Sequence, residues 1–253
     1  MSILIELLAA QEARTPVVLA IVVDTKHSVP RRAGSKMLVY GDGTISGTVG
    51  GGEMETRVVA EGLEAMVDRK PRRLTYPLVD PAAGDPGVCG GEVELYLEPH
   101  MPQTTIYVIG TGHVGQAVVE LATWLGYRVV AWDDRPALAE AVEAAHTTMT
   151  GPIAEAIEIE PIDEHTMVIM ATRNVQLDTE LLPKLLATPT PYVGLMGSTR
   201  RWDTTRKRLL DAGISEADLD RVNAPIGIEI QAETPAEIAV SILAEVIGNG
   251  HGP

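Results

Sequence analysis

Three glycines in the pattern Gly-x-Gly-x-x-Gly, at Gly110, Gly112 and Gly115, point most directly to chemistry. In this pattern the first glycine permits a tight turn. The second lets a pyrophosphate approach the backbone, and the third lets a helix pack closely against a strand. The N-terminus of that helix offers free N–H groups and a partial positive charge to an anion. We therefore expect a phosphate-binding loop here, with His113 inside it as a further phosphate contact.

The segments on either side of the loop fit this interpretation. Residues 106–109 are apolar and rich in β-branched side chains, as in a buried strand, and apolar residues recur at helical spacing after the loop. A second predicted strand, residues 128–132, leads to Asp133, which follows the first glycine by 23 positions. The acidic residue that binds ribose hydroxyls is expected after ~20 positions. This order predicts a Rossmann unit. Because Arg135 could admit a 2′-phosphate, the choice between the two nicotinamide cofactors stays open.

A second glycine cluster, Gly50, Gly51 and Gly52, lies between a predicted strand and a predicted helix. Consecutive glycines are costly in chain entropy, so we expect a ligand or another backbone segment to come close. Their backbone N–H groups could then bind an anion. Glu53 follows the cluster as a further candidate, although an acidic residue also simply favours a helix N-terminus.

Four arginines and one cysteine complete the candidate site residues. Guanidinium groups suit phosphate. The candidates are Arg31 and Arg32 in a polar loop, and Arg200 and Arg201 at the start of a basic helix. The plainer interpretation of both pairs is a solvated surface. Cys89, the single cysteine, precedes two glycines in a Gly/Pro loop. As a thiolate it could bind a soft metal or handle sulfur, whereas a lone cysteine is usually a small buried apolar residue.

The composition argues against several classes of protein. Lys+Arg 20 against Asp+Glu 35 gives a net charge of −15, which argues against a nucleic-acid partner. The N-terminus lacks the basic start and apolar run of a signal peptide, and no run approaches the ~18 apolar residues of a membrane span. One cysteine gives no disulfide framework and no zinc-ligand spacing. We expect a cytoplasmic protein.

The order of predicted elements indicates an α/β protein with an N-terminal mixed α/β domain followed by a Rossmann-like parallel-sheet domain. We expect these domains at residues 1–100 and 104–200. Residues 201–253 are predicted to be a C-terminal helical segment that packs on either domain. Its final helix is marked by a capping box formed by Thr234 and Glu237.

The ordered set of motifs resembles the XdhC/CoxI family, the accessory proteins of molybdenum hydroxylases such as xanthine dehydrogenase. The resemblance covers nearly the whole chain. It rests on residues 28–37, 47–53 and 89–91 in the first half, on residues 110–115, 133–135, 194–198 and 200–201 in the second half, and on residues 224–227 and 234–245 in the tail.

The resemblance implies a chaperone rather than a catalyst. Family members bind the molybdenum cofactor (molybdopterin), protect it while its terminal sulfur is installed, and deliver it to the apo-hydroxylase. It therefore implies a molybdenum hydroxylase apo-enzyme and a cysteine desulfurase as partners, and a homodimer. Such proteins are often labelled xanthine dehydrogenase although they do not oxidise xanthine. We expect the cofactor between the two domains, with Cys89 near molybdenum or its sulfur.

One segment departs from the family's pattern, and two other functions stay open. The family often carries Thr-His-x-His-x-x-Asp after the late Rossmann strand, whereas residues 172–178 read Thr-Arg-Asn-Val-Gln-Leu-Asp. The departure points to a branch of the family with another ligand or another recipient enzyme. The first alternative is an NAD(P)-dependent oxidoreductase, which the glycine fingerprint and Asp133 support but for which no general acid is evident. The second is a nucleotide-sensing regulatory module.

Overall fold

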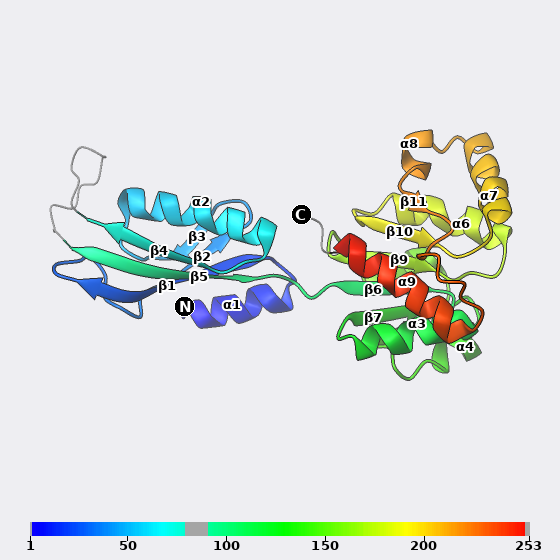
Figure 1. Cartoon of the computed structure of the whole chain (residues 1–253), viewed down its shortest axis with the longest axis horizontal. Coiled ribbons are helices and arrows are strands. Elements are labelled where there is room, and N and C mark those ends of the chain that lie inside the picture. The colour runs from blue at the N-terminus through cyan, green and yellow to red at the C-terminus, as the bar shows by residue number, and fades with distance from the viewer. Residues whose placement is uncertain (1, 79–90, 251–253) are drawn as a thin grey trace. The chain divides into compact units, whose positions relative to one another are not determined.

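The computed structural model describes residues 2–78 and 91–250, and the chain divides into two compact units (Figure 1). They are Met1–Pro102, here called the N-terminal unit, and Gln103–Pro253, the C-terminal unit. Within the described ranges, no helix combines the length and the apolar character that crossing a lipid bilayer requires.

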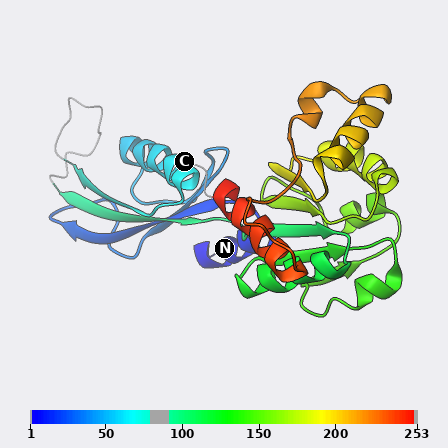
Figure 2. The same cartoon turned by 45° about the vertical axis from the view of Figure 1, so that its right-hand side comes forward.

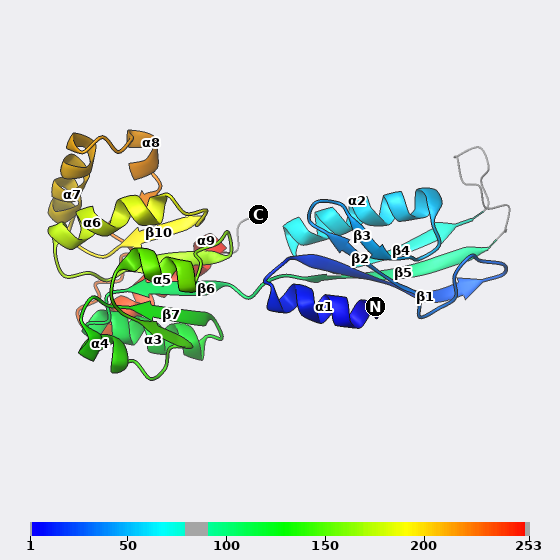
Figure 3. The ribbon, with the colours of Figure 1, turned by 180° about the vertical axis from the view of Figure 1, so that it is seen from behind.

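The N-terminal unit is an antiparallel sheet with a helix on each face (Figure 3). Its described residues form five strands in the order β3-β2-β1-β5-β4. The elements are α1 (Ile3–Glu12), β1 (Val17–Lys26), β2 (Lys36–Tyr40), β3 (Ile45–Gly47), α2 (Gly52–Asp68), β4 (Arg72–Pro77) and β5 (Glu92–His100). The side chains of the central strand β1 pack on both faces of the sheet, because side chains alternate along a strand. Val18 and Ala20 belong to the core with α2, and Val17 and Leu19 to the core with α1.

The C-terminal unit is a parallel sheet in the order β11-β10-β9-β6-β7-β8. The strands are β6 (Thr105–Ile109), β7 (Arg128–Trp132), β8 (Thr147–Met149), β9 (Thr166–Met170), β10 (Tyr192–Leu195) and β11 (Val222–Asn223). The chain runs from β6 outward to β8 and then returns to the other side of β6. The strand order therefore reverses between β6 and β9, which is where such sheets bind ligands. The predicted fold class, with its parallel Rossmann sheet, is confirmed.

Helices cover both faces of this sheet. They are α3 (His113–Trp124), α4 (Pro136–Glu140), α5 (Ile153–Ile159), α6 (Val175–Leu186), α7 (Thr199–Asp211), α8 (Glu216–Leu219) and α9 (Pro235–Gly250). Figure 2 brings α9 forward, where it lies across one face beside α3. Ile106 and Val108 of β6 join the core with α3 and α9, whereas Tyr107 and Ile109 join the core with α5 and α6 on the other face.

The last helix begins where its sequence predicts. The N–H group of Thr234 donates to Glu237 Oε2 at 2.9 Å, and the N–H group of Glu237 donates to Thr234 Oγ1 at 3.3 Å. This confirms the capping box. The short elements β8, α5, α8 and β11 were not predicted, because segments of two to seven residues carry too little periodicity.

Candidate functional site

The glycine loop between β6 and α3 contains one glycine that packing does not require. A Cβ atom on Gly110 would lie 2.6 Å from the carbonyl oxygen of Ala171, and one on Gly115 would collide with the carbonyl oxygen of Gly110. Packing therefore demands glycine at both positions. A Cβ atom on Gly112 would meet none of the described atoms within 4 Å, and its φ of −68° is open to any residue. The open space in front of Gly112 is what an approaching phosphate needs.

Gly112 is also the N-cap of α3. A Ser, Thr, Asp or Asn side chain at this position would accept a hydrogen bond from the first turn, and glycine has no side chain to do so. The first-turn N–H groups have no intrahelical partners and remain suited to an anion. His113, the first residue of α3, is exposed beside them. The loop thus has the backbone geometry of an anion-binding site.

Asp133 is buried and holds this loop in place. Its exposed fraction is 1%. Asp133 Oδ2 accepts from the N–H group of Thr111 at 2.8 Å, and Arg135 donates to Oδ1 at 2.8 Å and to Oδ2 at 2.9 Å. Burial acts to raise the pKa of Asp133, but the hydrogen bonds from Arg135 and Thr111 outweigh it and lower the pKa to about 2. Both carboxylate oxygens are engaged within the chain, and the predicted ribose contact stays a prediction.

A second ion pair joins the strand ends on either side of β6. Arg173, which lies beyond β9, donates to the two carboxylate oxygens of Asp134 at 2.6 and 2.7 Å. Asp134 lies beyond β7, and β9 and β7 flank β6 in the sheet. The side chains of Arg173 and Asp134 are 43% and 33% exposed, so solvent reaches the pair. Sequence reasoning noted Arg173 only as a departure from the family pattern and missed this contact.

The two arginines at the start of α7 differ in their surroundings. The guanidinium group of Arg201 donates to Asp178 at 2.8 and 2.7 Å and to the carbonyl oxygen of Thr172 at 3.0 Å. Asp178 is 0% exposed, and the side chain of Arg201 is 17% exposed. Arg201 therefore joins α7 to α6 and to the end of β9. Arg200 is exposed on α7, and of these two arginines it is the one that a ligand can reach.

In the N-terminal unit, the backbone just before α2, including Gly50 and Gly51 of the glycine triplet, binds a carboxylate of the chain itself, and Gly52 is the first residue of α2. The N–H groups of residues 49–51 donate to Glu55 Oε1 at 3.1, 3.3 and 2.9 Å, and Thr48 Oγ1 donates to the same atom at 2.5 Å. Burial acts to raise the pKa of Glu55, but these hydrogen bonds lower it overall. The predicted candidate, Glu53, is exposed. Glu55 lies one position beyond the usual capping-box spacing, which explains why the sequence pattern missed it.

Two contacts bring the motif segments of the N-terminal unit close to one another. A Cβ atom on Gly50 would lie 3.1 Å from Pro30 Cγ, so the loop containing residues 31–32 touches the glycine triplet. A Cβ atom on Gly91 would collide with the carbonyl oxygen of Ser28. Residues 31–32 are exposed. The contact between Ser28 and Gly91 joins segments about 60 positions apart, because β1 and β5 pair antiparallel with Lys26 opposite Glu92.

Cys89 lies outside the described residues, and its role as a thiol stays a prediction. Within residues 2–78 and 91–250, no group of three or more His, Cys, Asp or Glu side chains is placed to hold a metal ion.

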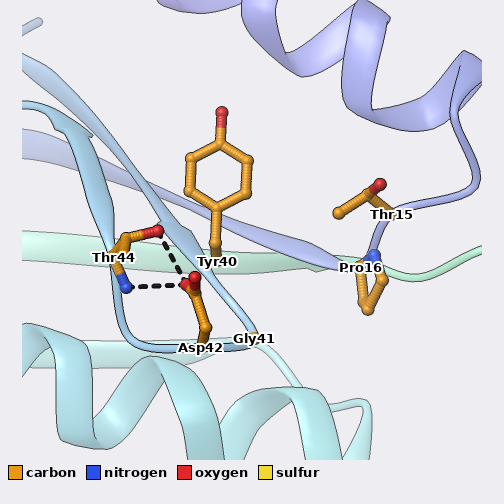
Figure 4. Close-up of a pocket in the computed structure, with 6 residues that line it drawn as sticks. All are labelled: Thr15, Pro16, Tyr40, Gly41, Asp42 and Thr44. Atoms are coloured by element: carbon orange, nitrogen blue, oxygen red, sulfur yellow. Dashed lines mark hydrogen bonds between the residues drawn. The ribbon is translucent and has the colours of Figure 1, made fainter.

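A cavity of about 340 Å³ lies in the N-terminal unit, between the start of β1 and the turn after β2 (Figure 4). It is lined by Thr15, Pro16, Tyr40, Gly41, Asp42 and Thr44. Asp42 Oδ1 accepts from the N–H group and the hydroxyl of Thr44 at 2.9 and 2.7 Å, so this carboxylate stabilises the turn. The lining residues lie outside the motifs described above.

Comparison with known proteins identifies the family of this chain. The family model for the XdhC Rossmann domain matches residues 106–246, and the model for the XdhC and CoxI family matches residues 10–77. The chain belongs to the XdhC and CoxI family. This confirms the resemblance inferred from the sequence motifs.

Relatives of this XdhC-family chain include two Escherichia coli proteins. YqeB is 35% identical over 257 residues, a match that covers 98% of this chain and 46% of YqeB. The chain therefore spans about half the length of that relative. PaoD, a molybdenum cofactor insertion chaperone, is 25% identical, with 90% of this chain and 82% of PaoD covered.

The fold is similar to a crystal structure of a xanthine dehydrogenase from Bacillus halodurans. The TM-score is 0.51, and the match covers 98% of this chain and 96% of the other. At 23% sequence identity, this likeness speaks for the fold alone.

Proposed function

We propose that this chain binds the molybdenum cofactor, molybdopterin, supports its sulfuration and delivers it to a molybdenum hydroxylase such as xanthine dehydrogenase. The similarity to PaoD along 90% of the chain supports a role in cofactor insertion. The structural observation that carries the proposal is Gly112. Packing does not require glycine there, and the position opens onto space at a helix N-terminus. A phosphate of the ligand that approaches the backbone at this position would explain why the residue is glycine.

The residues present fit a phosphorylated pterin. The cofactor supplies the molybdenum chemistry through its dithiolene sulfurs, and the chain supplies binding groups. In the C-terminal unit, the N–H groups of the first turn of α3 and the exposed His113 would hold the phosphate, with Arg200 as a further source of charge. In the N-terminal unit, Arg31 would supply charge beside Gly50, Gly51 and Gly52. The N–H groups of Gly50 and Gly51 donate to Glu55, so a ligand would have to replace that carboxylate to use them as donors. Cys89 would bind molybdenum or handle the incoming sulfur.

The proposal extends to the surroundings of the protein. A cysteine desulfurase would supply the sulfur, the apo-hydroxylase would receive the loaded cofactor, and the chain would act as a homodimer in the cytoplasm. NAD(P) is proposed only as an additional ligand of the C-terminal unit.

A binding measurement on the full chain tests the function. Molybdopterin is titrated against the wild type, Cys89→Ala and Gly112→Ser, and binding is followed by equilibrium dialysis. We expect the wild type to bind, Gly112→Ser to bind more weakly, and Cys89→Ala to retain the pterin while losing sulfur transfer to an apo-hydroxylase. Failure of the wild type to bind would end the proposal. Hydride transfer to a small substrate with a nicotinamide cofactor would instead support the oxidoreductase alternative.

A further inference from the structure

We infer a phosphomonoester subsite at the carboxyl edge of the Rossmann sheet, formed by Arg135 and Arg173. Asp133 holds Arg135 in place, and Asp134 is the exchangeable carboxylate that pairs with Arg173. The inference goes beyond cofactor delivery, because it concerns one phosphate group and does not depend on whether the rest of the ligand is a pterin or a nucleotide.

The four side chains form a network of alternating charge. Arg135 Nε lies 2.8 Å from Asp133 Oδ1 and 3.9 Å from Asp134 Oδ1, and Arg173 Nη1 lies 2.6 Å from Asp134 Oδ1. The network therefore runs from the end of β7 to the end of β9, past the carboxyl end of β6 where the glycine loop starts. The side chains of Arg135 and Arg173 are each 43% exposed. Two guanidinium groups are thus accessible beside a loop built to receive an anion.

The arrangement of Asp133 decides the class of ligand. A ribose diol is bound by a carboxylate with oxygens free to accept hydrogen bonds. Asp133 is 1% exposed, and its oxygens already accept from Thr111 and Arg135. What this position presents to solvent is a guanidinium group. Guanidinium forks form paired hydrogen bonds with phosphate oxygens, so the chemistry favours a phosphate ester over a free diol.

The pair of Arg173 and Asp134 is the exchangeable part of the network. An ion pair this exposed contributes little to stability, so separating it costs the fold little. A phosphate can replace the carboxylate on Arg173 with the same bidentate geometry and a larger negative charge. Asp133 cannot be exchanged in this way, because it is buried and also holds the backbone of Thr111.

Two sources of such a phosphate are tested separately. The full chain is titrated by calorimetry at low salt with adenosine 2′,5′-bisphosphate, with adenosine 5′-phosphate, and with phosphorylated hydroxymethylpterin beside its unphosphorylated form. We expect at least one phosphorylated probe to bind about tenfold tighter than its partner that lacks the phosphate, since charge-assisted hydrogen bonds are of that order. The probe that shows the preference identifies the source.

Opposite effects of two variants separate this subsite from a structural ion pair. Arg173→Ala should weaken binding of the preferred probe about tenfold. Asp134→Asn should strengthen its binding up to about fivefold, because it removes the competing carboxylate. The matched control is Arg206→Ala, which breaks a surface pair with Asp220 (3.0 Å) in the same unit and should leave binding unchanged.

Three results would overturn the subsite. They are equal binding of probes with and without the phosphate, equal weakening by Arg173→Ala and Asp134→Asn, and a comparable loss in Arg206→Ala. Thermal unfolding without ligand shows whether each variant is folded. If the chain binds no molybdopterin but retains this phosphate preference, the proposed cofactor role fails while the subsite stands.

Discussion

Replacing Gly112 by serine is expected to stabilise the C-terminal unit and to weaken ligand binding at this loop. The new Cβ atom would meet no described atom within 4 Å, and φ of −68° suits serine. Its hydroxyl would cap α3, which is worth a few tenths of a kcal/mol relative to glycine. Restricting the unfolded backbone adds roughly 0.4–1 kcal/mol. For a unit of this size the sum of about 1 kcal/mol raises Tm by ~2–4 °C.

The same change at Gly115 is expected to have the opposite effect on stability. A Cβ atom there would collide with the carbonyl oxygen of Gly110 and lie 2.9 Å from its carbonyl carbon. These are backbone atoms of the same loop, so they cannot move without displacing it. Overpacking of this kind costs about 3 kcal/mol, which lowers Tm by roughly 6–12 °C.

Thermal unfolding and molybdopterin binding, measured on the same samples, check the reasoning. The serine side chain occupies the space that we assign to the phosphate, so binding by Gly112→Ser should fall at least about tenfold. Gly248→Ala is the control, because its Cβ atom also meets no described atom within 4 Å, and it lies inside α9 away from the loop. It should gain about 1 kcal/mol with unchanged binding. A lower Tm for Gly112→Ser, or unchanged binding despite a higher Tm, would refute the argument.

Other changes test the supporting contacts. Arg201→Ala leaves the 0% exposed Asp178 without its ion-pair partner and should lower the free energy of unfolding in urea by about 3–5 kcal/mol. The folded-state pKa of Glu55 is lowered, so its contribution is complete above the unfolded pKa of roughly 4.3 and is lost as the pH falls through the folded pKa. Glu55→Gln should flatten this part of the stability–pH curve in urea titrations. Thr234→Ala breaks the capping box with Glu237 and should cost about 1 kcal/mol in thermal unfolding.

Local patterns were sufficient to predict the Rossmann unit and the last helix. The glycine loop and the capping box are made by residues a few positions apart, so their spacing alone specifies their geometry. Spacing also located Asp133 correctly at the end of β7. It could not show the direction of the carboxylate, because that depends on Thr111 and Arg135 and on the register of two strands.

The sequence alone also could not distinguish adjacent residues that have different roles. Arg200 and Arg201 look equivalent in the chain, but neighbouring positions on a helix point about 100° apart, and only the fold shows which of them meets Asp178. The sequence pattern singled out Glu53 and gave no sign of Glu55, whose carboxylate accepts from the N–H groups of residues 49–51. Glu55 lies two positions after Glu53 and therefore on another face of α2.

The bond from Thr111 to Asp133 also determines what binding costs. A segment rich in glycine samples many backbone conformations when it is unrestrained, and a partner that had to select one of them would lose affinity. Here a carboxylate from the neighbouring strand fixes the turn at 2.8 Å during folding of the sheet. The conformational entropy of this turn is therefore lost on folding and not on ligand binding. The ligand meets a turn that is already ordered, and binding does not include the entropy cost of ordering it.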